Sequence, residues 1–584
     1  MHQISMVSAP VPAAPMLSDL FSNEDAKSIE QQLVELSPVD RAMRSIERVL
    51  KDGLTAVVAF SSGKDSSVTA NLTLNAAINV IREGFTCPPV VISHSDTMVE
   101  SPVVRALADG ELAKMKAFAD RHGIPIEVRV GRPSLSACFA TRIIGARALP
   151  PFPQLGVRDC STSWKALVNQ RTIRKVTARD AKVVTLIGTR RDESQARAVN
   201  TAARGETADE PWANSDGDLM LSPILHWSSD EIWTYIGEAS AGLHLSYSDF
   251  AEVMDFYRDA GASSCVVVAD MKSAATNKAC GARGGCWTCT AVQNDRSVEN
   301  MLEQNPGKYP YLVPLLRLRD YLAGSQWDWS LRNFIGRTIS PEGRIKVQAD
   351  QYSPKMVEDL LYYILAAQDE ANRLGAPAPV RAVGLRELIA IDFWWSARAI
   401  HPPFHALAIY FDHCAGNVRF APKIERPCRP SPTPVIGEIY VGKDWDDDTS
   451  ALYPNGLRYV EWELHSDSCG PGLRSNKAGK VFLDLEEAPE LDVDEQSAAD
   501  FLEFIAPEKI EQYHRKDCRD WTLGALIYLQ YGTVSIGTGQ SSMVDSIMRR
   551  SQWLQHHGLH GHQTAEALRP RCCDLAEQQA ELFT

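Results

Sequence analysis

The chain is organised around the stretch AVVAFSSGKDSS, which runs from Ala56 to Ser67. Its first residues, Ala56 to Phe60, form an apolar run that predicts a short buried strand. A turn of small residues follows, and Val68 and Leu72 then recur at the spacing of a helix. A strand that turns into a helix in this way forms a phosphate cradle, because the first N–H groups of the helix are free and its dipole favours an anion.

The residue types of the turn suit this interpretation. Gly63 lets the backbone approach a ligand closely, and Lys64 supplies a positive charge. Asp65 does not suit anion binding, so it indicates a metal ion or a specific hydrogen bond. The hydroxyl groups that could donate to a phosphate belong to Ser61, Ser62, Ser66 and Ser67. The alternative is an ordinary strand-to-helix turn without a ligand.

The spacing of this loop differs from the Walker A pattern. The loop resembles the SGGKDS signature of the PP-loop ATP pyrophosphatases, which cleave ATP to AMP and pyrophosphate. Ser62 stands where that signature usually has glycine. Because serine carries a Cβ atom, we expect Ser62 to hold the turn only if its φ angle is not positive.

Composition limits the possible functions. The 584 residues suffice for several domains, 44% of them are apolar, and the formal net charge is −14. This charge argues against a broad DNA-binding face on this chain alone, although DNA could be presented by a partner or lie in a local basic groove. The sequence shows no secretory signal pattern and no membrane span, so we expect a cytoplasmic protein without a membrane partner. In that compartment the 13 cysteines favour thiols or metal ligands over disulfides.

Apolar strands alternate with long helices over the first half of the chain. Strands are expected at 56–60, 89–93, 126–130 and from Val183, with a helix over 103–122 that ends at Gly123. This order predicts an α/β fold with a mostly parallel sheet, helices on both faces and ligands at the carboxyl ends of the strands. Residues 200–220 are polar and indicate a loop or lid.

The second half is more irregular. Ser353, Pro354 and Gly375 mark the cap, the first turn and the end of a helix, and a further helix is expected over 380–400. The aromatic stretch DFWWSARAIHPPFHALAIYF indicates packing core, and a surface for docking a partner is the alternative. The expected domains are a flexible segment with a short helix (1–40), the PP-loop domain (41–262), an iron–sulfur loop with four cysteines (263–300), a helical domain (301–420), a Pro-rich linker (421–434) and an α+β C-terminal domain without an assigned role (435–584).

Four cysteines interrupt the α/β pattern. They are Cys265, Cys280, Cys286 and Cys289. Four thiolates on short glycine-rich loops can surround one soft metal centre, and the spacing fits zinc as well as a [4Fe–4S] cluster. Buried cysteines without a ligand are the alternative.

Several motifs in order resemble one branch of the PP-loop family. SSGKDSS, SDTMVE, RDCSTSWK, GTRRDES and PILHWSSDEIW are similar to the phosphoadenylylsulfate (PAPS) reductases. The block CGARGGCWTCT, with an upstream cysteine and following helices, is closer to DndC, the sulfur-transfer protein of bacterial DNA phosphorothioation, and to the related SspD. The chain lacks the ECGLH-type motif of PAPS reductases, since Cys572 and Cys573 lie in RPRCCDLAE. The resemblance covers roughly residues 40–395 and implies an adenine nucleotide α hydrolase-like (HUP) fold.

The resemblance also implies roles for individual residues. It assigns catalysis to Lys64, Asp65, Arg190 and Arg191. It assigns contacts with ATP and Mg²⁺ to Ser61, Ser62, Gly63, Lys64, Asp65, Ser66, Ser67, Asp96, Glu100, Gly188 and Arg197. It favours a [4Fe–4S] cluster on Cys265, Cys280, Cys286 and Cys289.

Each assignment outside the loop has a structural alternative. Asp96 and Glu100 could belong to a solvated acidic loop, and the arginines could form a salt-bridged surface cluster. Lys165 could contact an anion, and Cys160 could carry a persulfide or be a structural thiol. The histidines of HHGLHGH, 556–562, are expected on a solvated surface.

The resemblance therefore implies ATP-dependent sulfur transfer to the DNA backbone, in the context of restriction-modification and antiphage defence. The expected cofactors are ATP, Mg²⁺ and a [4Fe–4S] cluster. The expected partners are a cysteine desulfurase or another sulfur donor, and proteins that present DNA. Alternatives are a sulfurtransferase or reductase for an adenylated small molecule, and a nucleotide-gated assembly subunit without catalysis.

Overall fold

The structure is a computed structural model of the whole chain. It describes residues 36–152, 160, 162–177, 182–261, 284–424, 429–446, 473–475, 481–483, 490–514, 518–537 and 540–572. The helix expected over 22–36 and the strand-like stretch RYVEWEL (458–464) fall outside these residues, except for Leu36 itself.

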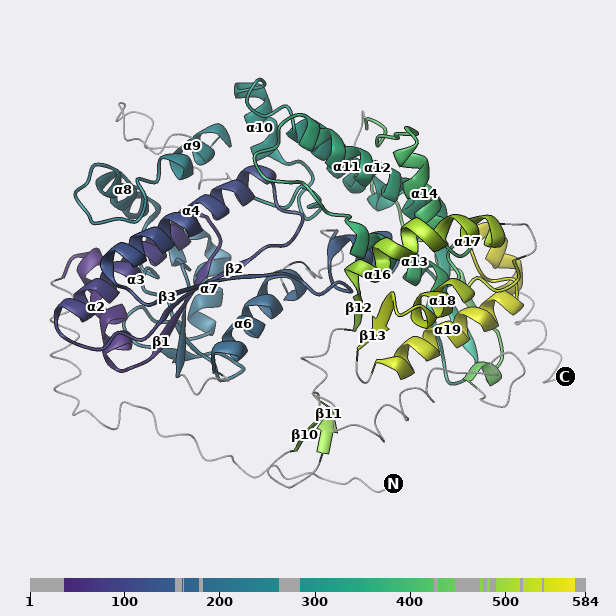
Figure 1. Cartoon of the computed structure of the whole chain (residues 1–584), viewed down its shortest axis with the longest axis horizontal. Helices are drawn as coiled ribbons and strands as arrows, with labels where there is room; N and C mark the ends of the chain where they lie inside the picture. Colours follow the sequence, from purple (N-terminus) through teal and green to yellow (C-terminus); the bar gives the residue numbers. More distant parts are fainter. Residues whose placement is uncertain are drawn as a thin grey trace.

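A six-stranded sheet forms the core of the first lobe (Figure 1). The strands are ordered β3-β2-β1-β4-β6-β5, and every neighbouring pair is parallel except β5 with β6. Their bounds are β1 (Thr55–Phe60), β2 (Val90–Ser95), β3 (Ile126–Gly131), β4 (Val183–Leu186), β5 (Trp212–Ala213) and β6 (Leu219–Leu221). The predicted α/β class with a mostly parallel sheet is therefore confirmed.

Helices cover both faces of this sheet. The apolar side chains of β1 alternate between the two faces, so each face needs a covering helix. Val57 packs with Val91 and Val176 on the face covered by α6, whereas Ala56 and Val58 join the larger core beneath α2, α3 and α4. The helices of this lobe are α2 (Pro38–Lys51), α3 (Lys64–Arg82), α4 (Pro102–His122), α6 (Leu167–Thr177), α7 (Gln195–Ala203), α8 (Ser229–Ser240) and α9 (Ala251–Asp259).

Local sequence signals determine where these helices begin and end. The hydroxyl group of Ser37 caps α2 by accepting from the Asp40 N–H. Gly123 ends α4 in the left-handed conformation, with φ +68°, as its sequence predicts. The strand expected at 89–93 is β2, which extends to Ser95.

The polar segment 200–220 contains more regular structure than a loop. It includes the end of α7 and the short antiparallel pair β5–β6. Asn214 closes the turn between the two strands, since its side-chain oxygen accepts from the N–H groups of Asp216 and Asp218, each at 2.9 Å. The expected loop is therefore present over 204–211, and asparagine organises the following turn into a short hairpin that the sequence did not predict.

The second lobe combines helices with a three-stranded antiparallel sheet. Its helices are α10 (Arg296–Gln304), α11 (Leu312–Gly324), α12 (Pro354–Arg373), α13 (Leu385–Ala397), α14 (His405–Cys414), α16 (Glu495–Asp500), α17 (Ala506–Tyr513), α18 (Leu523–Gln530) and α19 (Ser541–His556). Its sheet has the order β7-β8-β9, with β7 (Arg332–Ile339), β8 (Arg344–Tyr352) and β9 (Gly437–Tyr440). Further short strands are β10 (Leu473–Ser475), β11 (Val481–Leu483), β12 (Leu491–Val493) and β13 (Val534–Ile536).

Two features of this lobe differ from the sequence-based expectation. Residues 301–420 contain the hairpin β7–β8 in addition to helices, and β9, from beyond the Pro-rich stretch, pairs with β8. The helix expected over 380–400 begins only at Leu385. The cap at Ser353 and the end of α12 near Gly375 agree with the prediction, as does the packing role of Trp394 and Trp395, which are completely buried.

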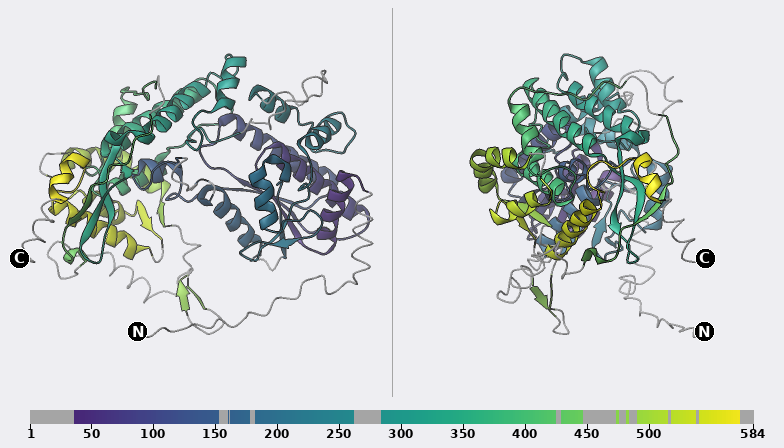
Figure 2. Two further views of the ribbon diagram at one scale, coloured as in Figure 1. Left: turned by 180° about the vertical axis from the view of Figure 1, so that it is seen from behind. Right: turned by 90° about the vertical axis from the view of Figure 1, so that its right-hand side faces the viewer.

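A short insertion between β3 and β4 connects the two lobes (Figure 2). The π-helix Ala140–Ile144 packs against α12 and α13. The indole N–H of Trp395 donates to the Ile144 carbonyl at 2.6 Å, and the Arg147 guanidinium lies 4.2 Å from the ring centre of Trp394. Among the residues that the structure describes, no helix is long and apolar enough to span a membrane.

Candidate functional site

The loop between β1 and α3 adopts a strained conformation at Ser62. The φ angle of this residue is +56°, and its hydroxyl group donates to the Ser61 carbonyl at 2.6 Å. The expectation that Ser62 avoids a positive φ was therefore wrong. The turn requires the left-handed region, and the short polar side chain of serine tolerates it by bonding to the adjacent carbonyl.

The first turn of α3 lacks a side-chain cap. Gly63 is its N-cap residue and makes no capping hydrogen bond. The Lys64 N–H faces the hydroxyl group of Tyr257, from α9, at 3.4 Å. The hydroxyl groups of Ser61 and Ser66 lie 3.1 Å apart beside this turn, whereas Ser67 is completely buried. An uncapped helix start of this kind suits a phosphate group.

Two cations converge on Asp65. The Lys64 ammonium lies 3.0 and 2.9 Å from its two carboxylate oxygens, and the Arg190 Nε donates to one of them at 2.6 Å. Both cationic side chains are buried, and Arg190 also contacts the Trp227 carbonyl. The sequence left two roles open for Asp65, a metal ligand or the acceptor of a specific hydrogen bond. The structure shows the hydrogen bonds. The three charges sum to +1, which favours an anion at this helix start.

Gly188 brings Arg190 close to the loop. A Cβ atom on Gly188 would lie 3.0 Å from the carbonyl oxygen of Asp65 and 3.1 Å from the Ser66 nitrogen. The segment after β4 therefore passes directly against the backbone of the first turn of α3. Any side chain at position 188 would push the two segments apart.

We therefore expect Gly188→Ala to weaken binding of a phosphate-bearing ligand, with ATP as the probe, and to destabilise the protein by about 1–3 kcal/mol, as is usual for overpacking. The measurements are calorimetric ATP titration and urea unfolding. Gly237→Ala is the matched control, because its added Cβ meets no atom within 4 Å and lies within α8. ATP affinity equal to that of the wild type in Gly188→Ala would contradict the close approach.

The other arginines of this segment lie away from Asp65. Arg191 and Arg197 are exposed, and Arg197 pairs with Glu193 at 2.9 Å on the first turn of α7. The structure thus brings Lys64, Asp65, Gly188 and Arg190 together but leaves these two side chains at the surface. They are accessible to a substrate that extends beyond the loop.

Asp96, at the end of β2, is part of a buried ion-pair network. One of its oxygens accepts from Arg105 and from Arg132, each at 2.9 Å, and the other accepts from the Met98 N–H. This carboxylate therefore stabilises the loop after β2 and is not solvated.

Glu100 lies in the same loop but is much less well paired. Its Oε2 atom is buried without a hydrogen-bond partner among the described residues, 3.8 Å from the His94 ring. Burial raises the pKa of the Glu100 carboxyl group, and the nearby charges of His94 and Lys165 act in the opposite direction. A buried carboxylate oxygen without a hydrogen-bond partner, close to the phosphate loop, suits contact with a cation or a donor group of a ligand.

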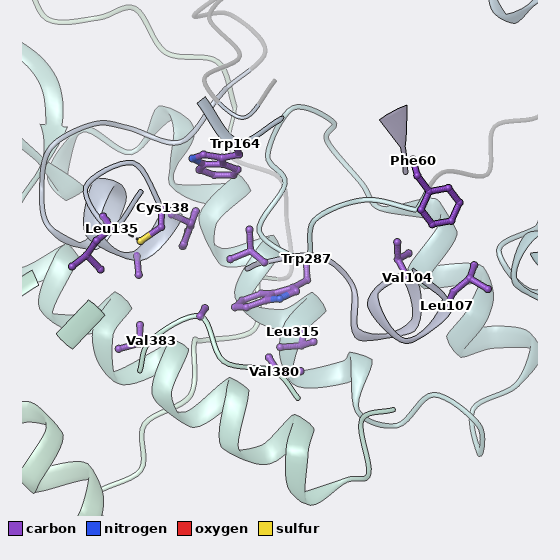
Figure 3. Packing of buried hydrophobic residues seen from close by; sticks show 14 of the residues in the cluster. Phe60, Val104, Leu107, Leu135, Cys138, Trp164, Trp287, Leu315, Val380 and Val383 are labelled. Atoms are coloured by element: carbon purple, nitrogen blue, oxygen red, sulfur yellow. Dashed lines mark hydrogen bonds between the residues drawn. The ribbon is translucent and has the colours of Figure 1, made fainter. Parts of the chain in front are cut away.

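The CxxC segment docks on this loop. The backbone N–H of Trp287 donates to the Val99 carbonyl at 2.9 Å, and the backbone N–H of Ser101 donates to the Gly285 carbonyl at 3.1 Å. Glu100 and Cys286 form an isolated antiparallel β-bridge through their backbones. Figure 3 shows the buried Trp287 ring close to Leu315 and Val380 of the second lobe. Cys286 therefore lies at the carboxyl end of β2, next to the strand that carries the phosphate loop.

The second lobe fixes the other end of the CxxC segment. Arg319 of α11, 1% exposed, donates to the Cys289 carbonyl at 3.0 Å and to the Gln293 carbonyl at 2.6 Å. The Cys289 N–H donates to the Cys286 carbonyl at 3.0 Å, which closes a tight turn between the two cysteines. This arrangement fits a thiolate-ligated metal centre. Cys265 and Cys280 lie outside the described residues.

The Cys286 thiol is buried. Burial raises the pKa of its thiol to about 12, and its Sγ atom lies 3.4 Å from the hydroxyl oxygen of Thr97. Cys160, the candidate persulfide carrier, is half-buried against the main core, and Lys165 is exposed.

Sequence reasoning missed Thr97, Tyr257 and Arg319. Only Thr97, within the SDTMVE motif, had a signal that could have identified it.

The fold and the loop define an α/β domain of the nucleotide-binding type. Residues 55–251 match the family model described as the phosphoadenosine phosphosulfate reductase domain. This PAPS reductase-like domain indicates sulfur chemistry that involves an adenine nucleotide or a sulfonucleotide.

A solved structure is also similar to this chain. It is the phosphoadenylyl-sulfate (PAPS) reductase from Candida auris in a phosphate complex, with 16% sequence identity and a TM-score of 0.21. The similarity covers 38% of this chain and 88% of that chain. The curated proteins contain no match to the sequence.

Proposed function

We propose that this chain is a PP-loop ATP pyrophosphatase that transfers sulfur to the DNA backbone, as DndC-type proteins do. One observation carries the proposal. The uncapped start of α3, with Lys64 and Arg190 around Asp65, lies at the same edge of the sheet as the docked CxxC segment. A phosphate site and a thiol site at one edge suit a reaction that activates a phosphate and then delivers sulfur.

The first step is adenylation of the target. The triphosphate lies at the start of α3, where Lys64 and the loop amides stabilise negative charge on the phosphates. A non-bridging oxygen of the DNA phosphate attacks the α-phosphorus of ATP, and the bond to the pyrophosphate leaving group breaks. Glu100, whose Oε2 atom has no hydrogen-bond partner among the described residues, would help to hold Mg²⁺, which would supply positive charge for the leaving pyrophosphate. Arg190 holds Asp65 in place and frees Lys64 to move from the carboxylate to the phosphates.

The second step replaces oxygen by sulfur. A sulfide-level sulfur attacks the activated DNA phosphorus, and AMP leaves with the former DNA oxygen. If the donor is a persulfide, a second thiol cleaves the remaining S–S bond and supplies the two electrons. A [4Fe–4S] centre on the CxxC segment, when bound, would supply a sulfide-bearing or redox-active group beside this step. Because the net charge is −14, partner proteins present the DNA, and a cysteine desulfurase or another donor supplies the sulfur.

We expect ATP turnover to require Mg²⁺ and to give AMP and pyrophosphate. The reason is that the loop has the pyrophosphatase spacing, so the bond at the α-phosphorus is the one that breaks. Chromatography of the nucleotide products with and without a chelator is the measurement. ADP as the main product would overturn the assignment to this class.

Sulfonucleotide reduction is the second candidate, because residues 55–251 match the PAPS reductase domain. The two functions differ in their products. Phosphorothioate linkages in genomic DNA, detected by mass spectrometry and lost when the gene is deleted, would support the DNA substrate. Release of sulfite from a sulfonucleotide, with no such linkages, would support the reductase.

A further inference from the structure

We propose that Glu358, His401 and His405 form a binding site for a divalent transition-metal ion of the Zn²⁺ type in the second lobe. One ring nitrogen from each histidine and one carboxylate oxygen all lie within 4.8 Å of one another. The three residues come from α12, from the turn after α13 and from the start of α14. This site is separate from the phosphate loop and from the cysteine segment.

The orientation of His401 is fixed from outside the cluster. Its Nε2 atom lies 3.0 Å from the carbonyl oxygen of Pro354, and the side chain is buried beside the Trp395 ring. A carbonyl can only accept, so Nε2 carries the proton and Nδ1 keeps its lone pair. A backbone carbonyl that fixes the tautomer of a histidine is the usual outer partner of a metal ligand.

A strained turn positions His405. The preceding residue, Phe404, has a φ angle of +64°, which is unfavourable for a bulky side chain. The buried carboxylate of Asp392 holds this turn by accepting from the N–H groups of Phe404 and Ala406, and Tyr528 donates to the same carboxylate. Backbone strain that is maintained by several buried hydrogen bonds often accompanies a ligand site.

Glu358 faces both histidines with one oxygen. Its Oε2 atom lies 3.4 Å from the His405 Nε2 atom, whereas its Oε1 atom contacts the Lys355 ammonium. The two imidazole rings stack at 4.4 Å with an angle of 23° between their planes. A neutral imidazole ring is the form that binds a metal ion. Lys355 also pairs with Asp359 and is largely exposed, so it can leave the site.

Two histidines and one carboxylate are the donor set of many zinc sites, and they leave coordination positions open for water. Ligand atoms on one tetrahedral ion are separated by roughly 3.4 Å, for bonds of about 2.1 Å. The separations here extend to 4.8 Å, so binding must draw the donors together. Glu358 and His405 are partly exposed and have room to move, whereas His401 is buried.

The test is the zinc content of the full-length chain after equilibration with Zn²⁺ and dialysis, measured by mass spectrometry. We expect His405→Gln and Glu358→Gln to bind one equivalent less than the wild type. Zinc bound to the cysteines would be the same in the wild type and in both variants, so it does not affect the difference in zinc content between them. Zn²⁺ should also raise the melting temperature more for the wild type than for either variant.

The matched control is His413→Gln. His413 is as buried as His401 and pairs with the Asp369 carboxylate at 2.8 Å, but it belongs to no cluster of three donors among the described residues. We expect this variant to keep the wild-type zinc content. Equal zinc in all four proteins would overturn the proposal. If His405→Gln does not fold, Glu358→Gln decides, because glutamine keeps the shape of this partly exposed side chain.

Discussion

Lys64→Ala is expected to lower pyrophosphate release from ATP by about 100-fold or more, the usual effect of removing one preorganised charge from a transition state. The Lys64 ammonium is the charge closest to the start of α3 that can move onto a phosphate. Arg190 is held by the Asp65 carboxylate and by the Trp227 carbonyl, so it cannot replace the lysine.

The fold of the variant should stay intact. Asp65 keeps its ion pair with Arg190 at 2.6 Å, so no buried carboxylate is left without a partner. Alanine also favours the helix that begins at this position. The measurements are a pyrophosphate assay and circular dichroism. Lys114→Ala is the matched control, because Lys114 also pairs with carboxylates in the same lobe but lies on α4. Turnover like that of the wild type in Lys64→Ala would refute the loop assignment.

Cys286→Ser is expected to remove a [4Fe–4S] cluster from anaerobically purified protein, together with its brown colour and most of its solubility. Serine is similar in size but is a poor ligand for a soft metal centre. Sulfur transfer should fall much more than ATP binding, because the phosphate loop belongs to a separate strand–helix unit. Iron and sulfide analysis with an absorbance spectrum is the measurement.

Cys138→Ser is the control for this experiment. Cys138 is also a buried thiol, but it donates to the Leu135 carbonyl and lies outside the cysteine segment. It should keep its iron and its colour. If strictly anaerobic wild-type protein contains stoichiometric zinc and no iron, the cluster prediction is wrong and the cysteines form a structural zinc site.

The sequence predicted the local elements of the site well. The strand, the loop and the start of α3 follow from short-range patterns, and so does the end of α4 at Gly123. Ser62 was misjudged because a general preference of serine does not reveal that this turn demands a positive φ. The hairpin β7–β8 is only partly visible in the sequence, because apolar and polar residues alternate in the first half of β8 but not in β7.

Long-range contacts could not be predicted in the same way. Tyr257 reaches the Lys64 N–H across 193 residues, and Arg319 reaches the Cys289 carbonyl from a separate helix. Nothing in the spacing of these residues indicates that they meet. The partners of Asp96 could not be predicted either, because Arg105 and Arg132 lie outside the SDTMVE motif that contains Asp96.

The contact between Trp395 and Ile144 also affects synthesis of the chain. These residues are separated by 251 positions, and the π-helix that contains Ile144 is buried against α12 and α13. At about 5–20 residues per second, a ribosome needs roughly 13–50 s to make the partner of Ile144 after Ile144 itself. During that time the nascent first lobe exposes apolar residues next to a nearly complete sheet. The insertion between β3 and β4 therefore cannot complete its packing until the second lobe emerges.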